Sequence, residues 1–340
     1  PLCGETTCWS PRSLSASPQL CMRSTESPFV LLSLVHFGLA VLSVSGDSVC
    51  STENILCSQD TMIKHIPAAA LHVSEPNPAW FGNGPNKPDK SWSNGNWLKS
   101  RFHFSFAEYR NNKNDHFGVL RVMNDDLVQP KRGFGTHPHE DMEIMTYVVH
   151  GKLTHKDSMG NSRQVGRGGV QYMSAGTGVR HSEHNTGKGP LRFIQCWVVP
   201  DRRGYEPRYG QFNGKASSRK DQWAHLVSAL SDPDVETPVK VHQDVNMYAT
   251  ELNQGVGLPY ELQPRRQAYI LCIEGEVRVV VNGREALLQR HDALEVYGAK
   301  DSPVLVEVIA EGVERTETGE RAHLLMFEMQ RDGSGGRKDL

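Results

Sequence analysis

Two short segments of the sequence place histidines and a carboxylate at spacings that suit a bound metal ion. His137 and His139 are separated by one residue, and His181 and Glu183 are separated in the same way further along the chain. On a β-strand, side chains two residues apart point to the same face, so each segment can direct two ligands to one side. Imidazole suits Fe, Zn, Cu and Ni, and a single carboxylate favours divalent iron or manganese.

A set of four protein ligands also predicts what such a metal site would do. Around a six-coordinate cation they leave about two positions open, which is typical of a reactive site rather than a structural one. An isolated His-x-His on a strand is more often exposed or paired within the protein. The second segment, Gly-x-Gly-x-x-His-x-Glu, makes the pattern specific. We therefore interpret the four residues as one metal site.

Other side chains near these segments could support the site. Glu143 lies four residues after His139 and could face inward, either as a further ligand or as a hydrogen-bond partner of one. Among the three nearby histidines we expect at most one supporting residue, and His184 is the candidate. The histidines of the second half have no His-x-His or His-x-Glu partner, so we expect no metal site there. The nearby histidines are His150, His155 and His184, and those of the second half include His225, His242, His291 and His323.

The segments that must position these residues are short and β-like. Strand-like runs separated by turns begin at residues 102–109 and continue to 198, and a similar pattern fills the second half after the polar stretch 200–221. Residues 157–161 and Asn282-Gly283 predict hairpin turns, whereas residues 222–230 could form one short helix. The two halves show a weak internal repeat. We therefore expect an all-β fold of two tandem barrels or sandwiches with few short helices.

Composition excludes several classes of protein. The 340 residues include 37 basic and 39 acidic side chains, giving a net charge of −2, and 38% are hydrophobic. Direct nucleic-acid binding is not expected, because it needs a basic excess or patch. Five of the seven cysteines precede residue 58, and only Cys196 and Cys272 lie beyond it. The body of the chain is therefore not held by disulfides, and these two cysteines are expected to be buried, inert thiols.

The first 61 residues are expected to form an N-terminal extension. Ser27 to Gly46 contains no charged side chain and follows Met22 closely. Three interpretations remain open: a secretory or organellar leader starting at Met22, a membrane anchor of marginal length, or translation starting at Met62. The compartment is cytoplasmic in the last case and secretory or organellar in the first. The remaining expected divisions are a metal-binding domain at 62–205, a second domain at 206–331 without a metal, and a flexible tail at 332–340.

The sequence resembles the pirin family of the cupin superfamily. The resemblance rests on SFAEY, FGVLRVMNDD, GFGTHPHEDMEIMTYVVHG, HKDSMGN and MSAGTGVRHSEHN, between residues 97 and 200, and continues more loosely to about 328. It is strongest to the pirin-like proteins described as quercetin 2,3-dioxygenases. It implies a bicupin with one divalent metal in the N-terminal barrel, held by His137, His139, His181 and Glu183. The metal would be Fe(II), with Cu, Mn, Co, Ni or Zn as alternatives.

The activity implied by the resemblance is the cleavage of a flavonol heterocycle by O₂ with release of CO. A flavonol offers a 3-hydroxyl beside a 4-carbonyl, and Glu183 could accept the hydroxyl proton. The candidate lining residues are Met145, Tyr147, Met173, Phe193 and Trp197. The mature body would be a monomer that does not enter a membrane. A different enolisable aromatic substrate is also compatible with the site.

A second interpretation is a redox-sensing, iron-containing pirin that acts as a transcription-factor co-regulator. That role needs a protein partner and would be favoured by a basic patch. The sequence offers a modest set of basic residues in and near the linker, namely Arg202, Arg203, Arg208, Lys215, Arg219 and Lys220.

Overall fold

The computed structural model describes residues 55–57, 61–85 and 95–331. The predicted leader at 27–46 and the predicted tail at 332–340 lie outside these residues. In the part of the chain that the structure describes, none of the helices has the length and apolar character that a membrane crossing requires. The helices described there are three 3₁₀ turns, η1 (Ala68–Ala70), η2 (Trp80–Gly82) and η3 (Ala216–Ser218).

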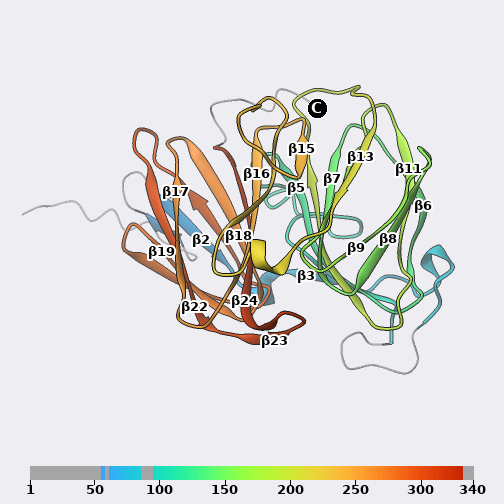
Figure 1. The fold of residues 1–340 in the computed structure, drawn as a ribbon, viewed down its shortest axis with the longest axis horizontal. Helices are drawn as coiled ribbons and strands as arrows, with labels where there is room; N and C mark the ends of the chain where they lie inside the picture. Colours follow the sequence, from blue (N-terminus) through green and yellow to red (C-terminus); the bar gives the residue numbers. More distant parts are fainter. Residues whose placement is uncertain (1–54, 58–60, 86–94, 332–340) are drawn as a thin grey trace, which may run out of the picture. The chain divides into compact units, whose positions relative to one another are not determined.

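The first half of the body is built from two β-sheets (Figure 1). The seven-stranded sheet has the order β13-β10-β7-β12-β5-β4-β3, and the four-stranded sheet has the order β6-β11-β8-β9. Apolar side chains from both sheets, including Val148 and Phe193 from the large one and Leu153 and Val165 from the small one, form a shared core. The strands are β3 (His72–Ser74), β4 (Leu98–Phe102), β5 (Leu120–Val128), β6 (Gly133–His139), β7 (Glu143–His150), β8 (Lys152–Asp157), β9 (Ser162–Gly166), β10 (Val170–Ser174), β11 (Val179–Asn185), β12 (Leu191–Val198) and β13 (Arg208–Phe212).

The second half repeats this arrangement. A large sheet has the order β1-β2-β21-β18-β24-β16-β14-β15, with β23 paired to β24, and a four-stranded sheet has the order β17-β22-β19-β20. Their facing apolar side chains form a second core. The strands are β1 (Ile55–Cys57), β2 (Met62–Ile66), β14 (Ala224–Ala229), β15 (Val239–Val241), β16 (Val245–Leu252), β17 (Gly257–Leu262), β18 (Arg266–Glu274), β19 (Glu276–Val281), β20 (Arg284–Gln289), β21 (Ala293–Tyr297), β22 (Val304–Gly312), β23 (Glu314–Thr316) and β24 (Gly319–Gln330).

The two large sheets pack against each other through a third apolar core. It includes Met145 and Tyr147 of β7 together with Met247 of β16 and Tyr269 of β18. One face of each large sheet therefore covers its own small sheet, and the other face covers the opposite half. This arrangement confirms the predicted all-β architecture of two tandem barrels with few short helices.

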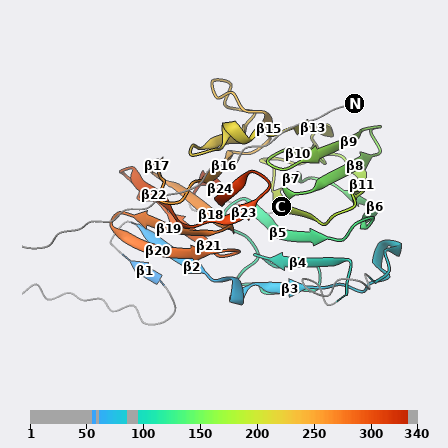
Figure 2. The same cartoon turned by 60° about the horizontal axis from the view of Figure 1, so that its bottom comes forward.

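Two strands, one early in the body and one within the polar stretch 200–221, pair with the half of the molecule to which their place in the sequence does not assign them. The early strand β2 pairs with β21 in the large sheet of the second half, as Figure 2 also shows. In return, β13 lies within the polar stretch yet pairs with β10 in the first half. Each barrel thus includes a strand from beyond the predicted division between 62–205 and 206–331, which itself stays a prediction.

Two predictions about local structure are wrong. The segment predicted as a short helix is the strand β14, which pairs with β16 and, in parallel, with β15. Both Leu226 and Val227 are buried, because neighbouring elements cover both faces of this strand. A short apolar run does not distinguish a helix from such a strand. The strand expected over 102–109 ends at Phe102, and only an isolated bridge joins Phe106 to Tyr109.

Candidate metal centre

The strands β6 and β11 bring three of the predicted ligands together. They pair antiparallel, with His137 opposite His181 and His139 opposite Val179. Because His137 and His139 share a strand face, both rings approach the ring of His181, with centroid distances of 4.6 to 4.9 Å. One ring nitrogen from each of the three residues lies within 4.8 Å of the others.

The ring nitrogens of the three histidines differ in their hydrogen-bond partners, which buried polar atoms normally have. The Nδ1 atom of His137 lies 2.7 Å from the carbonyl oxygen of Gly135, and since a carbonyl only accepts, Nδ1 holds the proton. In its neutral form the ring then presents a lone pair at Nε2, which lies 3.2 Å from Nε2 of His181. Among the described residues, the Nε2 atom of His139 is buried and has no hydrogen-bond partner.

This donor set fits a divalent cation. Two imidazole nitrogens that each lie about 2.1 Å from one metal ion are separated by roughly 3 Å, close to the separation seen here. Burial is the main cause that lowers the pKa of both His139 and His181 to about 3, and the neighbouring histidines lower it further. Both rings are therefore neutral at pH 7, which is the form that binds metals.

Glu183 lies in the same barrel but makes different contacts. The pairing of β6 and β11 shifts register here, because His181 lies opposite His137 and Glu183 lies opposite Phe134, so the extra residue is on β6. The buried carboxylate accepts hydrogen bonds from Gln171 Nε2 at 2.9 Å, Thr146 Oγ1 at 3.1 Å and Gln195 Nε2 at 3.0 Å. Its oxygen atoms group with nitrogens of His155 and His181, within 4.8 Å.

His155 contacts the candidate ligands although the sequence did not single it out. It is fully buried on β8, and its Nδ1 atom lies 3.4 Å from Nδ1 of His181. Its Nε2 atom lies 2.9 Å from Oδ2 of Asp157. The sequence signal that could have identified His155 is its His-x-Asp spacing to Asp157, where the predicted hairpin turn begins. The structure confirms this turn between β8 and β9.

The two supporting candidates chosen from the sequence lie elsewhere. Glu143 is buried, but its Oε1 atom contacts Ser174 Oγ at 2.8 Å and His242 Nδ1 at 3.0 Å. These contacts lie on the face of β7 that covers the second half, because the opposite face presents Thr146 to Glu183. His184 is half-buried and follows Glu183 on β11, so it points to the other face of that strand.

The predicted lining residues also separate by strand face. Met145 and Tyr147 belong to the core between the two halves, so they do not line the metal centre. Met173 and Trp197 pack in a small apolar cluster that also includes Val179, the residue opposite His139. The Trp197 ring contacts the His139 ring edge to face at a centroid distance of 4.8 Å. Of the five candidates, Trp197 therefore has a direct contact with a candidate ligand.

A surface depression of about 460 Å³ opens beside His139. Its volume is within the range of roughly 300–1,000 Å³ that is usual for small-molecule sites. It could admit a small aromatic molecule to the histidines. The lining residues are Pro138, His139, Glu140, Ser158, Gly178, Val179 and Arg180.

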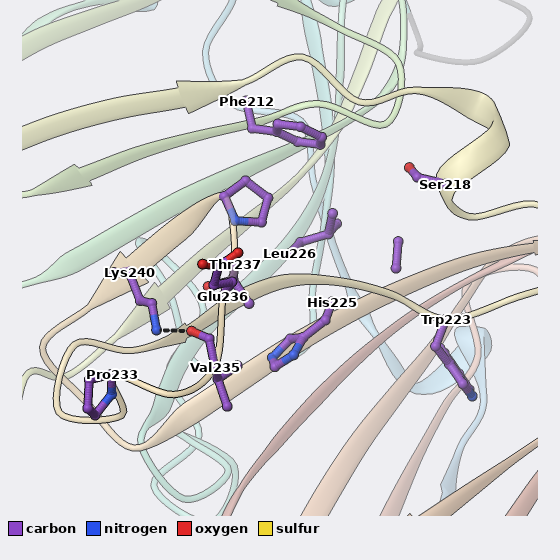
Figure 3. A pocket seen from close by; sticks show the side chains of 12 residues that line it. Phe212, Ser218, Trp223, His225, Leu226, Pro233, Val235, Glu236, Thr237 and Lys240 are labelled. Carbon is purple, nitrogen blue, oxygen red and sulfur yellow. Dashed lines mark hydrogen bonds between the residues drawn. The ribbon is translucent and has the colours of Figure 1, made fainter.

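A second depression, of about 690 Å³, lies by β13, β14 and the loop before β15 (Figure 3). Its lining includes Phe212, His225 and Lys240. His225 Nε2 lies 2.9 Å from Asn246 Oδ1, and Lys240 donates to the carbonyl oxygens of Asp232 and Val235. His225 Nε2 and Lys240 Nζ thus already have partners, whereas His139 Nε2 has none in the described part of the chain, so the histidine cluster is the better candidate site.

Two jelly-roll barrels with three inward-facing histidines on adjacent strands of the first define a cupin with a candidate metal centre. Comparison with known proteins agrees with this class. Residues 86–198 match the domain family described as Pirin, and residues 228–329 match the one described as Quercetinase C-terminal cupin domain. The chain belongs to the pirin family.

Individual relatives cover most of the body of the chain. It is 38% identical over 225 residues to the quercetin 2,3-dioxygenase of Escherichia coli strain K12, covering 64% of this chain and 94% of the relative. A crystal structure of YhhW from Escherichia coli aligns with a TM-score of 0.62 at 32% identity, covering 79% of this chain and 98% of that one. A nickel(II) complex of the bacterial pirin YhhW aligns equally well, at 30% identity and 79% and 100% coverage.

Proposed function

We propose that this chain is a metal-dependent dioxygenase that cleaves the heterocycle of flavonols such as quercetin. The observation that supports this most is the convergence of three imidazoles, with the buried Nε2 atom of His139 lacking a partner among the described residues. The relatives named quercetin 2,3-dioxygenase support the reaction class.

The metal proposed here is Fe(II), held by His137, His139 and His181, with Glu183 as the fourth ligand. When bound, it would supply Lewis acidity toward the substrate oxygens and a route for electrons to O₂. The nickel(II) complex of the related YhhW supports a divalent metal ion in general, without favouring iron. Elemental analysis of protein purified without added metal tests the choice of Fe(II), and protein that contains zinc alone would contradict it.

We infer a path for substrate and proton from the side chains of the barrel. The depression beside His139 would admit the flavonol, and Trp197 would bound the aromatic rings. Glu183 would accept the proton of the 3-hydroxyl. Three hydrogen bonds from Thr146, Gln171 and Gln195 fix the orientation of its carboxylate for this role. Each turnover would consume one O₂ and release one CO.

The decisive experiment compares oxygen uptake and CO release with quercetin for the iron-loaded protein and two variants. His137→Ala removes one of three converging nitrogens, so we expect loss of bound iron and of turnover to background. His150→Ala is the matched control, because this histidine is exposed at the end of β7 and pairs with Glu317. Iron-loaded protein that turns over none of several flavonols and catechols would contradict the proposal.

The structure does not strengthen the alternative role as a co-regulator. The six basic residues that might have formed a patch have different environments. Arg219 is buried, with its Nε atom 2.9 Å from Glu251. Arg202 lies over the Tyr205 ring, and Arg208 lies near the Tyr172 ring. Arg219 therefore does not belong to an exposed basic surface, whereas the other five residues are exposed.

A further inference from the structure

We propose that His155 and Asp157 form a positioning pair that sets the tautomer and ring orientation of His181. The proposal deepens the function above and rests on the metal centre assigned there. It concerns side chains that would not touch the metal, the substrate or O₂.

The neighbouring strands β8 and β11 place the pair on the Nδ1 side of His181, away from the Nε2 atom that faces His137. Their register sets Asp157 opposite His181 and His155 opposite Glu183. His155 has no solvent exposure, and the Tyr209 ring stacks on it at a centroid distance of 4.5 Å and an interplanar angle of 20°. The imidazole of His155 is therefore confined to one plane, between the carboxylate and the candidate ligand.

The hairpin turn fixes the carboxylate of Asp157 and its charge state. Its Oδ1 atom accepts from the backbone N–H groups of Met159 and Asn161, each at 3.0 Å. The amide of Asn161 also donates to it, at 2.9 Å to Oδ2. Every one of these partners is a donor, so Asp157 acts as an acceptor only, as an ionised carboxylate does.

The proton positions follow from this acceptor. His155 must donate from Nε2 to Asp157, at 2.9 Å, and in the neutral form of the ring this leaves a lone pair at Nδ1. That lone pair lies 3.4 Å from Nδ1 of His181 and can accept only if His181 holds its proton there. The Nε2 atom of His181 then presents a lone pair toward Nε2 of His137.

The same orientation arises at His137 by a simpler route, since Gly135 O accepts from its Nδ1 atom. A backbone carbonyl thus orients one ligand, and a buried His–Asp pair orients the other. With the opposite tautomer, His181 would direct an N–H bond at the cation position and could not bind it. Partners of this kind usually change metal affinity by about 10- to 100-fold.

The tautomers can be measured directly in the metal-free wild-type protein. Long-range ¹H–¹⁵N correlation spectra of histidine-labelled protein, assigned with single histidine variants, distinguish the two neutral forms. We expect His181 protonated at Nδ1 and His155 protonated at Nε2. Finding His181 protonated at Nε2 would overturn the proposal. This measurement needs no bound metal, so it stays informative even if the proposed dioxygenase function fails.

Variants test the effect on metal binding, with cobalt(II) as the probe in competition with a chelator. Asp157→Asn removes the charge, and His155→Phe keeps a ring against Tyr209 while removing both nitrogens. We expect each to weaken cobalt binding at least tenfold and to change the ligand-field spectrum, with thermal unfolding recorded to confirm folding. A folded variant whose cobalt affinity is within twofold of wild type and whose ligand-field spectrum is unchanged would overturn the proposal.

Asp292→Asn is the matched control. Asp292 also accepts from a histidine, with Oδ2 3.0 Å from His65 Nε2, and from the backbone N–H groups of Ala68 and Gln289. It belongs to the second half, so the same loss of charge should leave cobalt binding unchanged. Equal weakening by Asp157→Asn and Asp292→Asn would overturn the positioning role in favour of a general loss of stability.

Discussion

At the residue scale, the candidate metal centre depends on side chains whose protonation is fixed by burial and by their neighbours. His139 and His181 are neutral because burial lowers the pKa of each to about 3. The environment of Glu183 is different, because its carboxylate accepts hydrogen bonds from the neutral side chains of Thr146, Gln171 and Gln195. The site thus combines neutral nitrogen donors with one strongly hydrogen-bonded carboxylate.

Replacing Glu183 with Gln tests how strongly that carboxylate is held. An amide has one acceptor oxygen, so its NH₂ group would face at least one of the donors Thr146, Gln171 and Gln195. We expect the metal-free protein to lose about 1–3 kcal/mol of unfolding free energy, which is the usual cost of an unsatisfied buried polar group. Urea unfolding measures this.

The control for this substitution is Glu285→Gln, at a side chain that is 57% exposed on β20. It should change the unfolding free energy by less than about 0.5 kcal/mol. A loss from Glu183→Gln no larger than that of the control would show that the donors do not stabilise the carboxylate.

At the element scale, strands that are distant in the sequence complete each barrel. The early strand β2 adds to β21 of the second half, with Ile63 opposite Val296. Ile63 is 3% exposed and packs in the second core. Residues near the start of the described body therefore stabilise the barrel that the rest of the second half forms.

Truncating Ile63 tests this exchange of strands. Ile63→Ala removes buried methyl and methylene groups and leaves a cavity, so we expect a loss of about 2–5 kcal/mol of unfolding free energy. Leu305→Ala is the control, because Leu305 is 56% exposed, and its loss should stay below about 0.5 kcal/mol. Chemical denaturation of the full chain measures both, and similar losses would contradict a buried role for β2.

At the scale of the whole molecule, buried polar pairs join the two halves across their apolar interface. Arg167 lies 2.7 Å from Glu274, and Tyr147 Oη lies 2.8 Å from His323 Nε2. His103 lies 2.9 Å from Tyr269 Oη and is completely buried. The pKa of His103 is lowered to about 4, mainly by burial; His291 and Arg101 also lower it, whereas Asp125 and Asp292 oppose the shift.

The buried His103 predicts a loss of stability in acid. Its pKa in the folded protein, about 4, lies below the ordinary 6.5. As the pH falls from 6.5 to 4, the unfolded chain therefore binds the proton first and folding weakens. At about 1.4 kcal/mol per pKa unit the loss is roughly 3 kcal/mol, and it levels off below pH 4.

The measurement is urea unfolding at pH 7, 5.5 and 4 for wild type and His103→Gln, which retains an acceptor for the Tyr269 hydroxyl. We expect the variant to lose about 3 kcal/mol less than wild type over this range. His150→Gln, at an exposed histidine, should follow wild type. Parallel curves for wild type and His103→Gln would contradict the prediction.

The sequence by itself determined the features that local backbone geometry dictates. The spacing of His137 and His139 places them on one strand face, and Asn282-Gly283 forms its two-residue hairpin because both residues adopt positive φ, 48° and 76°. Pairings between distant segments were decided only by the tertiary structure. Those pairings make 224–229 a strand, direct Glu143 toward His242, shift the register at Glu183 and set His155 behind His181. A contact between strands depends on register and sheet order, and neither is encoded in the spacing within one segment.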